Sequence, residues 1–466
     1  MINGHSTPPL SGDRLVFAGV IGLLSWISVP MGSNREWSSG LMQAWIFILF
    51  AAWLISHRRT LFEINWPNGT RAILSLGGFV LCWVAIQTIP LPAFLVELLN
   101  PALYEAYSNR PGVVIEDQWL PLSADVASTA AAWKLFCAYA ALFVLTLALV
   151  NSTQRLTIVL GVIVAIGVAQ CLYGIVVRFG GADLGLWDPG FSTNAVAGTY
   201  VNRNHFAGLV ILAIGLLLGQ FIKRSARGPE SLRLRNVLDW LTRGLLGPGL
   251  WITFLLVVLL GGLILSTSRG ALGSFAVAFV MTSVLVRQGR GLGRGSVVLG
   301  VLCVLAVLWF GSGDSVQSIS TKGFESNRPE LAKTTLKLIQ QAPVVGGGAG
   351  TYQWRFPQVR DERLHDAYYD HAHNDYLETL SDIGAVGFVP LLCAVFFLMR
   401  RLLHGACNRN DPVAAMASTG CFAACAAALT HALVDFNFQI PANAAYFFVI
   451  AATGLAAADR TVVRHK

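Results

Sequence analysis

Long runs of apolar residues recur along the whole chain, and they limit the folds that are open to it. A helix that crosses a lipid bilayer needs about 20 mostly apolar residues. Such runs lie at about 15–31, 40–57, 71–91, 129–150, 156–177, 205–222, 248–267, 270–286, 296–311, 384–403, 413–434 and 441–458. Two of them are short and nearly contiguous, so we expect a tight re-entry at residues 266–270. We therefore predict an all-α integral membrane protein with about twelve transmembrane helices.

The composition agrees with a protein that resides in a lipid bilayer. Hydrophobic residues make up 55% of the 466 residues and charged residues only 12%, against about 25% charged in ordinary soluble domains. The net charge of +8 does not indicate nucleic-acid binding, because the basic residues lie mainly in short loops between the apolar runs. The eight cysteines lie in the runs or in a predicted cytoplasmic loop, so we expect no disulfide framework.

The basic residues also predict the orientation in the membrane. Cytoplasmic loops carry an excess of lysine and arginine. With twelve spans and a cytoplasmic N-terminus, the most basic loops and the C-terminal Arg460, Arg464 and Lys466 all fall on the cytoplasmic side. We interpret the first run as an uncleaved helix, with a signal peptide as the alternative. Both termini are therefore predicted to be cytoplasmic.

Three longer segments fall on the opposite, outer face, at 92–128, 178–204 and 312–383. The last is the largest, and loops of this length in compact proteins are usually functional. We therefore divide the chain into three parts. These are spans 1–9 with short loops (1–311), a large outer loop that contains short helices (312–383), and spans 10–12 (384–466).

The same charge bias disfavours arginine in short outer loops, so we expect each arginine there to have a role that offsets this cost. Arg269 lies in a Ser-Arg-Gly segment between two spans, and Gly270 allows close approach of backbone or ligand. Arg203 lies at the mouth of the sixth span. A guanidinium matches phosphate oxygens in a bidentate way, so two arginines at one membrane face can hold a diphosphate. The alternative is that they cap helices or pair with lipid headgroups.

The densest group of titratable residues runs from 365 to 382, directly before the tenth span. A histidine here can act as a general base, because the unperturbed imidazole pKa is about 6.5. Its acidic members fall on one helix face if the chain is already helical there. They are Asp375, Glu378 and Asp382. Two other interpretations are a solvated loop, or a metal site at His371 and His373 that lacks an HExxH motif.

Several segments, in this order along the chain, are similar to the O-antigen ligase and polymerase family. They are Gly198–Gly208, Ser266–Gly270 and the glycine-rich Gly346–Tyr352. The most specific is His373-Asn374, followed after nine residues by Gly384-Ala-Val-Gly387, which resembles the family's His-Asn…Gly-x-x-Gly motif. The resemblance covers about residues 190–400, and twelve spans with one large, late outer loop agree with it.

The resemblance implies a periplasmic glycosyltransferase of the bacterial inner membrane that uses no nucleotide sugar, metal or other cofactor. Its donor would be a glycan on undecaprenyl diphosphate, and its acceptor a hydroxyl of lipid A core, another glycan or a protein. His373 matches the family's functional histidine, and Arg269 matches the arginine that binds the donor phosphates. The second such arginine would be Arg203 or, because many members carry another residue there, Arg178 or Arg328.

The same resemblance predicts which residues act on the substrates. The predicted catalytic residues are His373, Arg269 and Arg203, and the predicted substrate-binding residues are Asn374, His371, Arg178, Arg328, Asn204 and Tyr376. A positioned imidazole would assist the weakly nucleophilic hydroxyl by taking its proton. The diphosphate is a good leaving group and needs charge stabilisation instead. Direct displacement would invert the anomeric configuration. Trp354, Phe356, Tyr368 and Tyr369 are candidates either to stack on sugars or to form the core of the loop.

Two other classes of function remain open. One is a transporter, either a flippase of lipid-linked oligosaccharide or a carrier of a small anion. The other is a scaffold of a polysaccharide-assembly machine, whose proteins would also be partners of an enzyme. Ionisable residues are rare within the predicted spans, which disfavours an ion-coupled carrier. Within the enzyme class, ligation to lipopolysaccharide and polymerisation of O-antigen or exopolysaccharide are equally favoured.

Overall fold

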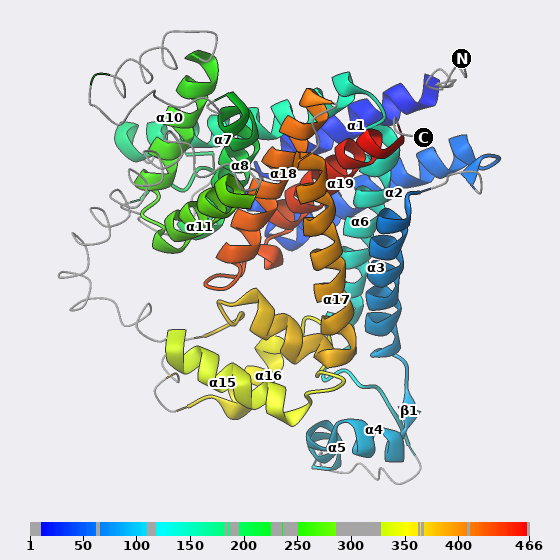
Figure 1. Cartoon of the computed structure of the whole chain (residues 1–466). Helices are drawn as coiled ribbons and strands as arrows, with labels where there is room; N and C mark the ends of the chain where they lie inside the picture. Colours follow the sequence, from blue (N-terminus) through cyan, green and yellow to red (C-terminus); the bar gives the residue numbers. More distant parts are fainter. Residues whose placement is uncertain are drawn as a thin grey trace.

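The computed structural model describes residues 11–61, 66–109, 118–181, 185–186, 195–224, 235, 250–285, 328–361, 364, 368–407 and 411–463. Nearly all of the regular structure among them is helical. The long helices are α1 (Ser11–Ile27), α2 (Glu36–His57), α3 (Asn68–Ile86), α6 (Val126–Leu149), α7 (Thr153–Gly180), α8 (Arg203–Arg224), α10 (Leu250–Leu265), α11 (Arg269–Leu285), α17 (Asp375–Cys407), α18 (Pro412–His431) and α19 (Pro441–Val463). They form one bundle (Figure 1).

The shorter elements lie in the connections between the long helices. They are η1 (Met31–Ser33), β1 (Leu91–Pro92), α4 (Ala93–Leu99), α5 (Pro101–Ser108), β2 (Trp119–Leu120), α15 (Arg328–Gln341), α16 (Tyr352–Val359) and η6 (Asn437–Gln439). β1 pairs antiparallel with β2, with Leu91 opposite Leu120. The helices α4, α5, α15 and α16 all lie at one end of the bundle. The start of α1 and the end of α19 lie at the other end (Figure 1).

The predicted all-α membrane architecture is confirmed. Eight described helices are long and apolar enough to cross a bilayer, and α10 and α11 are shorter apolar helices. Each predicted span has its helix in the structure except 296–311, which lies outside the described residues. The polar residues 266–268 separate α10 from α11, at the position where the sequence predicts a re-entry.

α8, α18 and α19 form the buried centre of the bundle. Glycines let the backbones of α8 and α18 meet, because a Cβ added at Gly215 would lie 2.4 Å from Ala424 Cα. A Cβ at Gly219 would likewise lie 2.4 Å from the Met416 carbonyl oxygen. Small residues are common where membrane helices associate, because lipid supplies no hydrophobic drive between helices. Peripheral helices such as α2 and α3 expose apolar side chains instead, as lipid-facing helices do.

In the described part of the large outer loop, the short helices α15 and α16 pack against the start of α17. Their shared apolar core is formed by Leu331, Leu338, Tyr352, Phe356, Leu364, Tyr369 and Ala372. α17 begins at Asp375, inside the segment that the sequence assigns to the loop, and it buries Asp375, Glu378 and Asp382. The described residues of the loop therefore share an apolar core and continue directly into the tenth predicted span.

A backbone junction ties the glycine-rich segment 343–350 to α17. The helix is interrupted at Gly384 (φ 61°, ψ −178°). Four backbone hydrogen bonds form the junction: Ala385 N to Pro343 O (2.9 Å), Val386 N to Val344 O (3.1 Å), Gly347 N to Ser381 O (3.0 Å) and Gly348 N to Asp382 O (2.9 Å). Gln87 of α3 closes it, since its Nε2 donates to the carbonyls of Val345 and Asp382 (2.9 and 3.0 Å). This junction fixes the chain that follows α15 against the first half of α17.

Candidate active site

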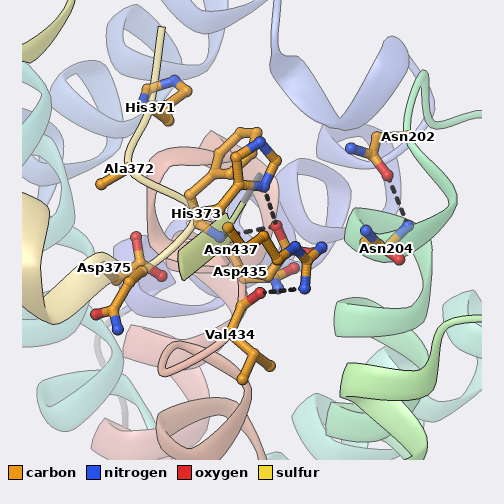
Figure 2. Close-up of polar contacts among 12 residues, drawn as sticks. Asn202, Asn204, His371, Ala372, His373, Asp375, Val434, Asp435 and Asn437 are labelled. Carbon is orange, nitrogen blue, oxygen red and sulfur yellow. Dashed lines mark hydrogen bonds and ion pairs between the residues drawn. The ribbon is translucent and has the colours of Figure 1, made fainter. Parts of the chain in front are cut away.

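His373 and Asp435 meet although they are distant in sequence. His373 lies just before α17, and Asp435 lies in the loop between α18 and α19 (residues 432–440). His373 Nδ1 is 3.5 Å from Asp435 Oδ1, and the Asp435 side chain is only 1% exposed. Figure 2 shows the imidazole directed at the carboxylate. With Nδ1 facing Asp435, Nε2 is the ring nitrogen left to exchange a proton with a substrate.

The backbone of His373 is held in an unfavourable conformation. Its φ is +49°, which costs a non-glycine residue on the order of 1–3 kcal/mol. Hydrogen bonds on both sides maintain it: Ala372 N to Glu378 Oε2 (2.7 Å), Asn374 Nδ2 to Leu433 O (2.9 Å) and Asp375 N to Ala432 O (2.9 Å). A strained residue that its surroundings keep in place is typical of a functional site.

His371 forms a second imidazole–carboxylate pair beside the first. Its Nδ1 is 2.7 Å from Glu378 Oε1, and the other oxygen of the same carboxylate binds Ala372 N. Burial lowers the pKa of His371, but the charge and the hydrogen bond of Glu378 outweigh burial and raise that pKa to about 9. His371 is therefore an imidazolium near neutral pH. It helps to fix the segment that leads to His373.

The interaction between His371 and Glu378 should make the free energy of unfolding depend on pH. The pKa of His371 is about 6.5 in an unfolded chain and about 9 in the folded protein. The stabilisation is therefore complete below about pH 6.5 and is lost as the pH rises through about 9. We expect the wild type to lose on the order of 2 kcal/mol across this window and His371→Gln to lack the loss. Thermal unfolding of both proteins over this range measures it, and parallel curves would contradict the assignment.

Asp435 is surrounded by imidazoles. His431 Nε2, at the end of α18, is 4.0 Å from Asp435 Oδ2. Burial raises the pKa of Asp435, but interactions with His373, His205 and His431 outweigh burial and hold that pKa below its usual range. The Phe436 ring packs among them, with centroid distances of 4.6 Å to His205, 4.5 Å to His371 and 4.7 Å to His373. A carboxylate anion therefore stands beside His373 at neutral pH.

The Ser-Arg-Gly segment at the start of α11 reaches the same loop. A Cβ added at Gly270 would lie 2.9 Å from Val434 Cγ2 and 3.4 Å from His431 Nε2. Only glycine leaves room for this close approach. Arg269 precedes it and is exposed, and its side chain makes no hydrogen bond or ion pair with the residues that the structure describes. Its guanidinium is therefore available to an anion.

Arg203 begins α8 and is bonded to the same segment. Its Nη1 donates to Thr267 Oγ1 (2.7 Å), two residues before Arg269. Thr267 has a φ of +54°, which is rare for a β-branched residue. The chain segments that carry Arg203 and Arg269 are therefore in direct contact.

The two alternative arginines are placed differently. Arg328 begins α15, and its Nη1 donates to the carbonyl of Val434 (2.9 Å), the residue before Asp435. Arg178 is exposed near the end of α7, with its guanidinium 5.4 Å from the ring of the adjacent Phe179. Within the described part of the chain, a bond to the 432–440 loop is thus found for Arg328 and not for Arg178.

Three other predicted substrate-binding residues lie at the ends of helices. Asn374 Oδ1 accepts from two amides in the first turn of α17 (3.0 Å each) and so caps that helix. Tyr376 OH donates to the carbonyl of Leu429 in α18 (2.9 Å). Asn204 is half-buried in the first turn of α8, where its backbone amide donates to Asn202 Oδ1 (2.8 Å). Asn374 and Tyr376 thus hold the start of α17 against the end of α18.

Residues 254–392 match the family described as O-antigen ligase. The chain carries an O-antigen ligase domain. The match covers less than a third of the 466 residues, and it includes Arg269, Arg328 and His373. No match to a curated protein is found. The domain supports, in general terms, a membrane glycosyltransferase of the ligase or polymerase type.

Part of the site lies outside the matched O-antigen ligase segment. Asp435, His431 and His205 are not in it. His205 lies within the segment Gly198–Gly208, but no motif includes His431 or Asp435. The one signal in the sequence is a histidine and an acid, four residues apart, near the end of an apolar run. Their roles depend on the fold, which returns the end of α18 to the segment that carries His373.

His371 and His373, two histidines just before α17, face different carboxylates. His371 faces Glu378, whereas His373 faces Asp435. Among the described residues, no three His, Cys, Asp or Glu side chains gather as they would around a metal ion. His371 instead pairs with Glu378, whereas His373 shares Asp435 with His431.

The aromatic residues of the outer loop divide into two groups. Phe356 and Tyr369 are buried in the core of the loop. Trp354 and Tyr368 are 53% and 68% exposed. Hydrogen bonds fix both exposed side chains: Trp354 Nε1 to Ser128 Oγ (2.9 Å) and Tyr368 OH to Gln353 Oε1 (3.0 Å). Two preoriented aromatic side chains of the O-antigen ligase domain are therefore open to solvent.

Proposed function

We propose that this protein transfers a glycan from undecaprenyl diphosphate to a hydroxyl acceptor at the outer, periplasmic face of the inner membrane. The contact between His373 and the buried Asp435 carries the proposal. The exposed Arg269 lies on a segment that packs against the same loop, which adds a cation for the donor diphosphate. The O-antigen ligase domain supports the same class of reaction.

In the proposed reaction, His373 acts as the general base. Its Nε2 takes the proton of the acceptor hydroxyl while that oxygen attacks the anomeric carbon of the donor. The bond between the anomeric carbon and the diphosphate oxygen breaks, and undecaprenyl diphosphate leaves with the electron pair. Asp435 stabilises the imidazolium that forms, because an adjacent carboxylate favours the charged ring. A single displacement of this kind inverts the anomeric configuration.

Arginines would hold the diphosphate and the charge that develops on it. Arg269 is the principal candidate, because its side chain is exposed and makes no bond within the described part of the chain. Arg203 donates to Thr267, and Arg328 donates to the carbonyl of Val434. A guanidinium has five N–H donors, so either residue can keep this bond and also bind a phosphate oxygen.

The remaining predicted residues fit supporting roles in this proposal. His371, Asn374 and Tyr376 position the segment around His373 through their bonds to neighbouring chain. The open faces of Trp354 and Tyr368 suit stacking against sugar rings of the glycan. The arrangement in Figure 1 supports the orientation, since the outer helices lie opposite the start of α1 and the end of α19.

Transfer by the purified protein tests the proposal. The protein in detergent receives undecaprenyl-diphosphate glycan in EDTA, with either lipid A core or further donor as the acceptor. We expect the donor to be consumed. Transfer to lipid A core identifies a ligase, lengthening of the donor glycan identifies a polymerase, and NMR of the new linkage should show inversion. A donor that stays intact with every acceptor would contradict the proposal, and a liposome flipping assay would then test the transporter alternative.

A further inference from the structure

A chain of buried hydrogen bonds runs beneath Asp435. Its members come from the segment before α8, from the 432–440 loop and from the ends of α18 and α19. The bonds are Tyr200 OH to Asn443 Oδ1 (3.0 Å), Asn443 Nδ2 to the His205 carbonyl (2.8 Å), Asn443 Nδ2 to Asn437 Oδ1 (3.0 Å) and Asn437 Nδ2 to His431 Nδ1 (2.9 Å). All of these side chains are buried, so the network is shielded from water and its polar atoms depend on one another.

The backbone carbonyl at one end of this series of hydrogen bonds fixes which atom is the donor in each of them. The carbonyl of His205 can only accept a hydrogen bond, so the side-chain nitrogen of Asn443 must face it. That nitrogen also donates to Asn437 Oδ1, which turns the Asn437 nitrogen toward His431. An amide nitrogen can only donate. His431 Nδ1 must therefore be the acceptor.

His431 is consequently a neutral imidazole whose proton is on Nε2. In a neutral ring one nitrogen donates and the other accepts, and the acceptor position is already assigned to Nδ1. Nε2 faces Asp435 Oδ2 at 4.0 Å, which is an electrostatic contact and not a full hydrogen bond. Oδ2 is buried and has no hydrogen-bond partner among the described residues. The opposite tautomer would direct a lone pair at this carboxylate.

We propose that Asn437 and Asn443 are positioning residues that hold His431 in the tautomer whose N–H faces Asp435. Asp435 then remains an anion directed at His373. This inference rests on the proposed function, because its consequence is the orientation of the carboxylate that faces His373. With the N–H of His431 turned away, a lone pair would face the buried Oδ2, and the carboxylate would no longer be held toward His373. The imidazolium that forms during transfer would then lose its positioned partner.

Several other charged or titratable groups act on the same cluster. They are His205 of α8, His371 before α17, Asp375 of α17, and Arg328 of α15, which faces His431. Their charges change the potential at Asp435, but none of them bonds to His431 Nδ1. Of the described residues, Asn437 alone makes that bond, so the tautomer depends on the two asparagines.

Gly208 of α8 leaves the space that this network occupies. A Cβ at this position would lie 2.1 Å from Asn437 Oδ1 and 2.9 Å from Asn443 Nδ2. Gly208 ends the segment that resembles the ligase and polymerase family. Its role in the fold is therefore to admit the two asparagines beside α8.

Kinetics of Asn437→Leu in two backgrounds, the wild type and His431→Gln, distinguish a positioning role of Asn437 from simple packing. Asn437→Leu removes the donor at similar volume, and we expect kcat for transfer to fall about 10–100-fold, with less than about a threefold change in KM for the donor. In His431→Gln, an amide nitrogen takes the place of Nε2. This nitrogen is always a donor, because an amide has no second tautomer. Asn437→Leu in that background should therefore cost less than about threefold in kcat. An equal loss in both backgrounds would make Asn437 purely structural and overturn the inference.

The tautomer can also be observed without any activity. In 15N NMR spectra of histidine-labelled protein, we expect His431, assigned by its absence in His431→Gln, to be protonated on Nε2 only. Protonation on Nδ1 in the wild type would overturn the inference even if transfer proceeds. A wild type that transfers no glycan would instead count against the proposed function and leave this spectrum as the test.

A second variant covers the case in which Asn437→Leu does not fold. Gly208→Ala displaces the asparagines without removing a polar group. In its 15N spectrum we expect His431 to be a mixture of two tautomers, one protonated on Nδ1 and the other on Nε2. Gly161→Ala is its control, because a Cβ at Gly161 meets nothing within 4 Å. An unchanged His431 spectrum in a folded Gly208→Ala protein would contradict the role of the network.

Discussion

Alanine in place of His373 is expected to lower kcat for glycan transfer about 10³-fold and to leave donor affinity nearly unchanged. A positioned general base contributes about 10²–10⁴-fold to a rate. The loss should appear in kcat, because the proton moves only as the acceptor oxygen attacks. His373 has the geometry for this role, since Nδ1 is 3.5 Å from Asp435 Oδ1 and Nε2 remains for the substrate. Single-turnover rates and equilibrium binding of labelled donor would measure the two effects separately.

Two further variants make this result specific to His373. His404→Ala removes an exposed histidine near the other end of α17 and should leave the rate unchanged. Asp435→Asn keeps the shape of the carboxylate but removes its charge, so it should lower kcat and add little to His373→Ala. If His373→Ala retains more than about a tenth of the wild-type kcat, His373 is not the base.

The helices could be predicted from the sequence because a bilayer leaves few alternatives. In lipid, every backbone donor and acceptor must be satisfied within the segment, so a long apolar run becomes a helix. The start of α17 is the instructive exception. The helix begins at Asp375 and not at 384, because its first turns pack against α15 and α16 and not against lipid. Those turns carry three acidic residues, which a search for apolar runs excludes.

The site could be predicted only in part, for a reason that is also physical. His373 and Arg269 stand in short motifs, so local sequence is enough to propose them as candidates. Asp435 stands in no such motif, and its meaning comes from a contact that the packing of α18 creates. The neighbouring His431 and Asp435 look like an isolated structural pair until the fold brings His205 and His373 to the same carboxylate.

The Gly-x-x-Gly motif has a role in the fold that its sequence does not reveal. Gly384 occupies a backbone region (φ 61°, ψ −178°) that is essentially restricted to glycine. A Cβ there would lie 2.3 Å from the Val344 carbonyl oxygen and 2.4 Å from Gly346 N. From the other side, a Cβ at Gly346 would lie 2.3 Å from the Asp382 carbonyl oxygen. The two glycine motifs therefore allow two stretches of backbone to meet directly.

Gly384→Ala is therefore expected to lower the free energy of unfolding by at least about 3 kcal/mol. The added Cβ meets backbone atoms, which cannot move without breaking the hydrogen bonds of the junction. The junction holds the chain that follows α15 against α17, and α17 begins two residues after His373, so transfer should be lost as well. Gly77→Ala in α3 is the matched control, since a Cβ there meets nothing within 4 Å, and its effect should stay within about 1 kcal/mol. Denaturant unfolding in detergent measures both, and equal stabilities would mean that Gly384 serves a substrate and not the junction.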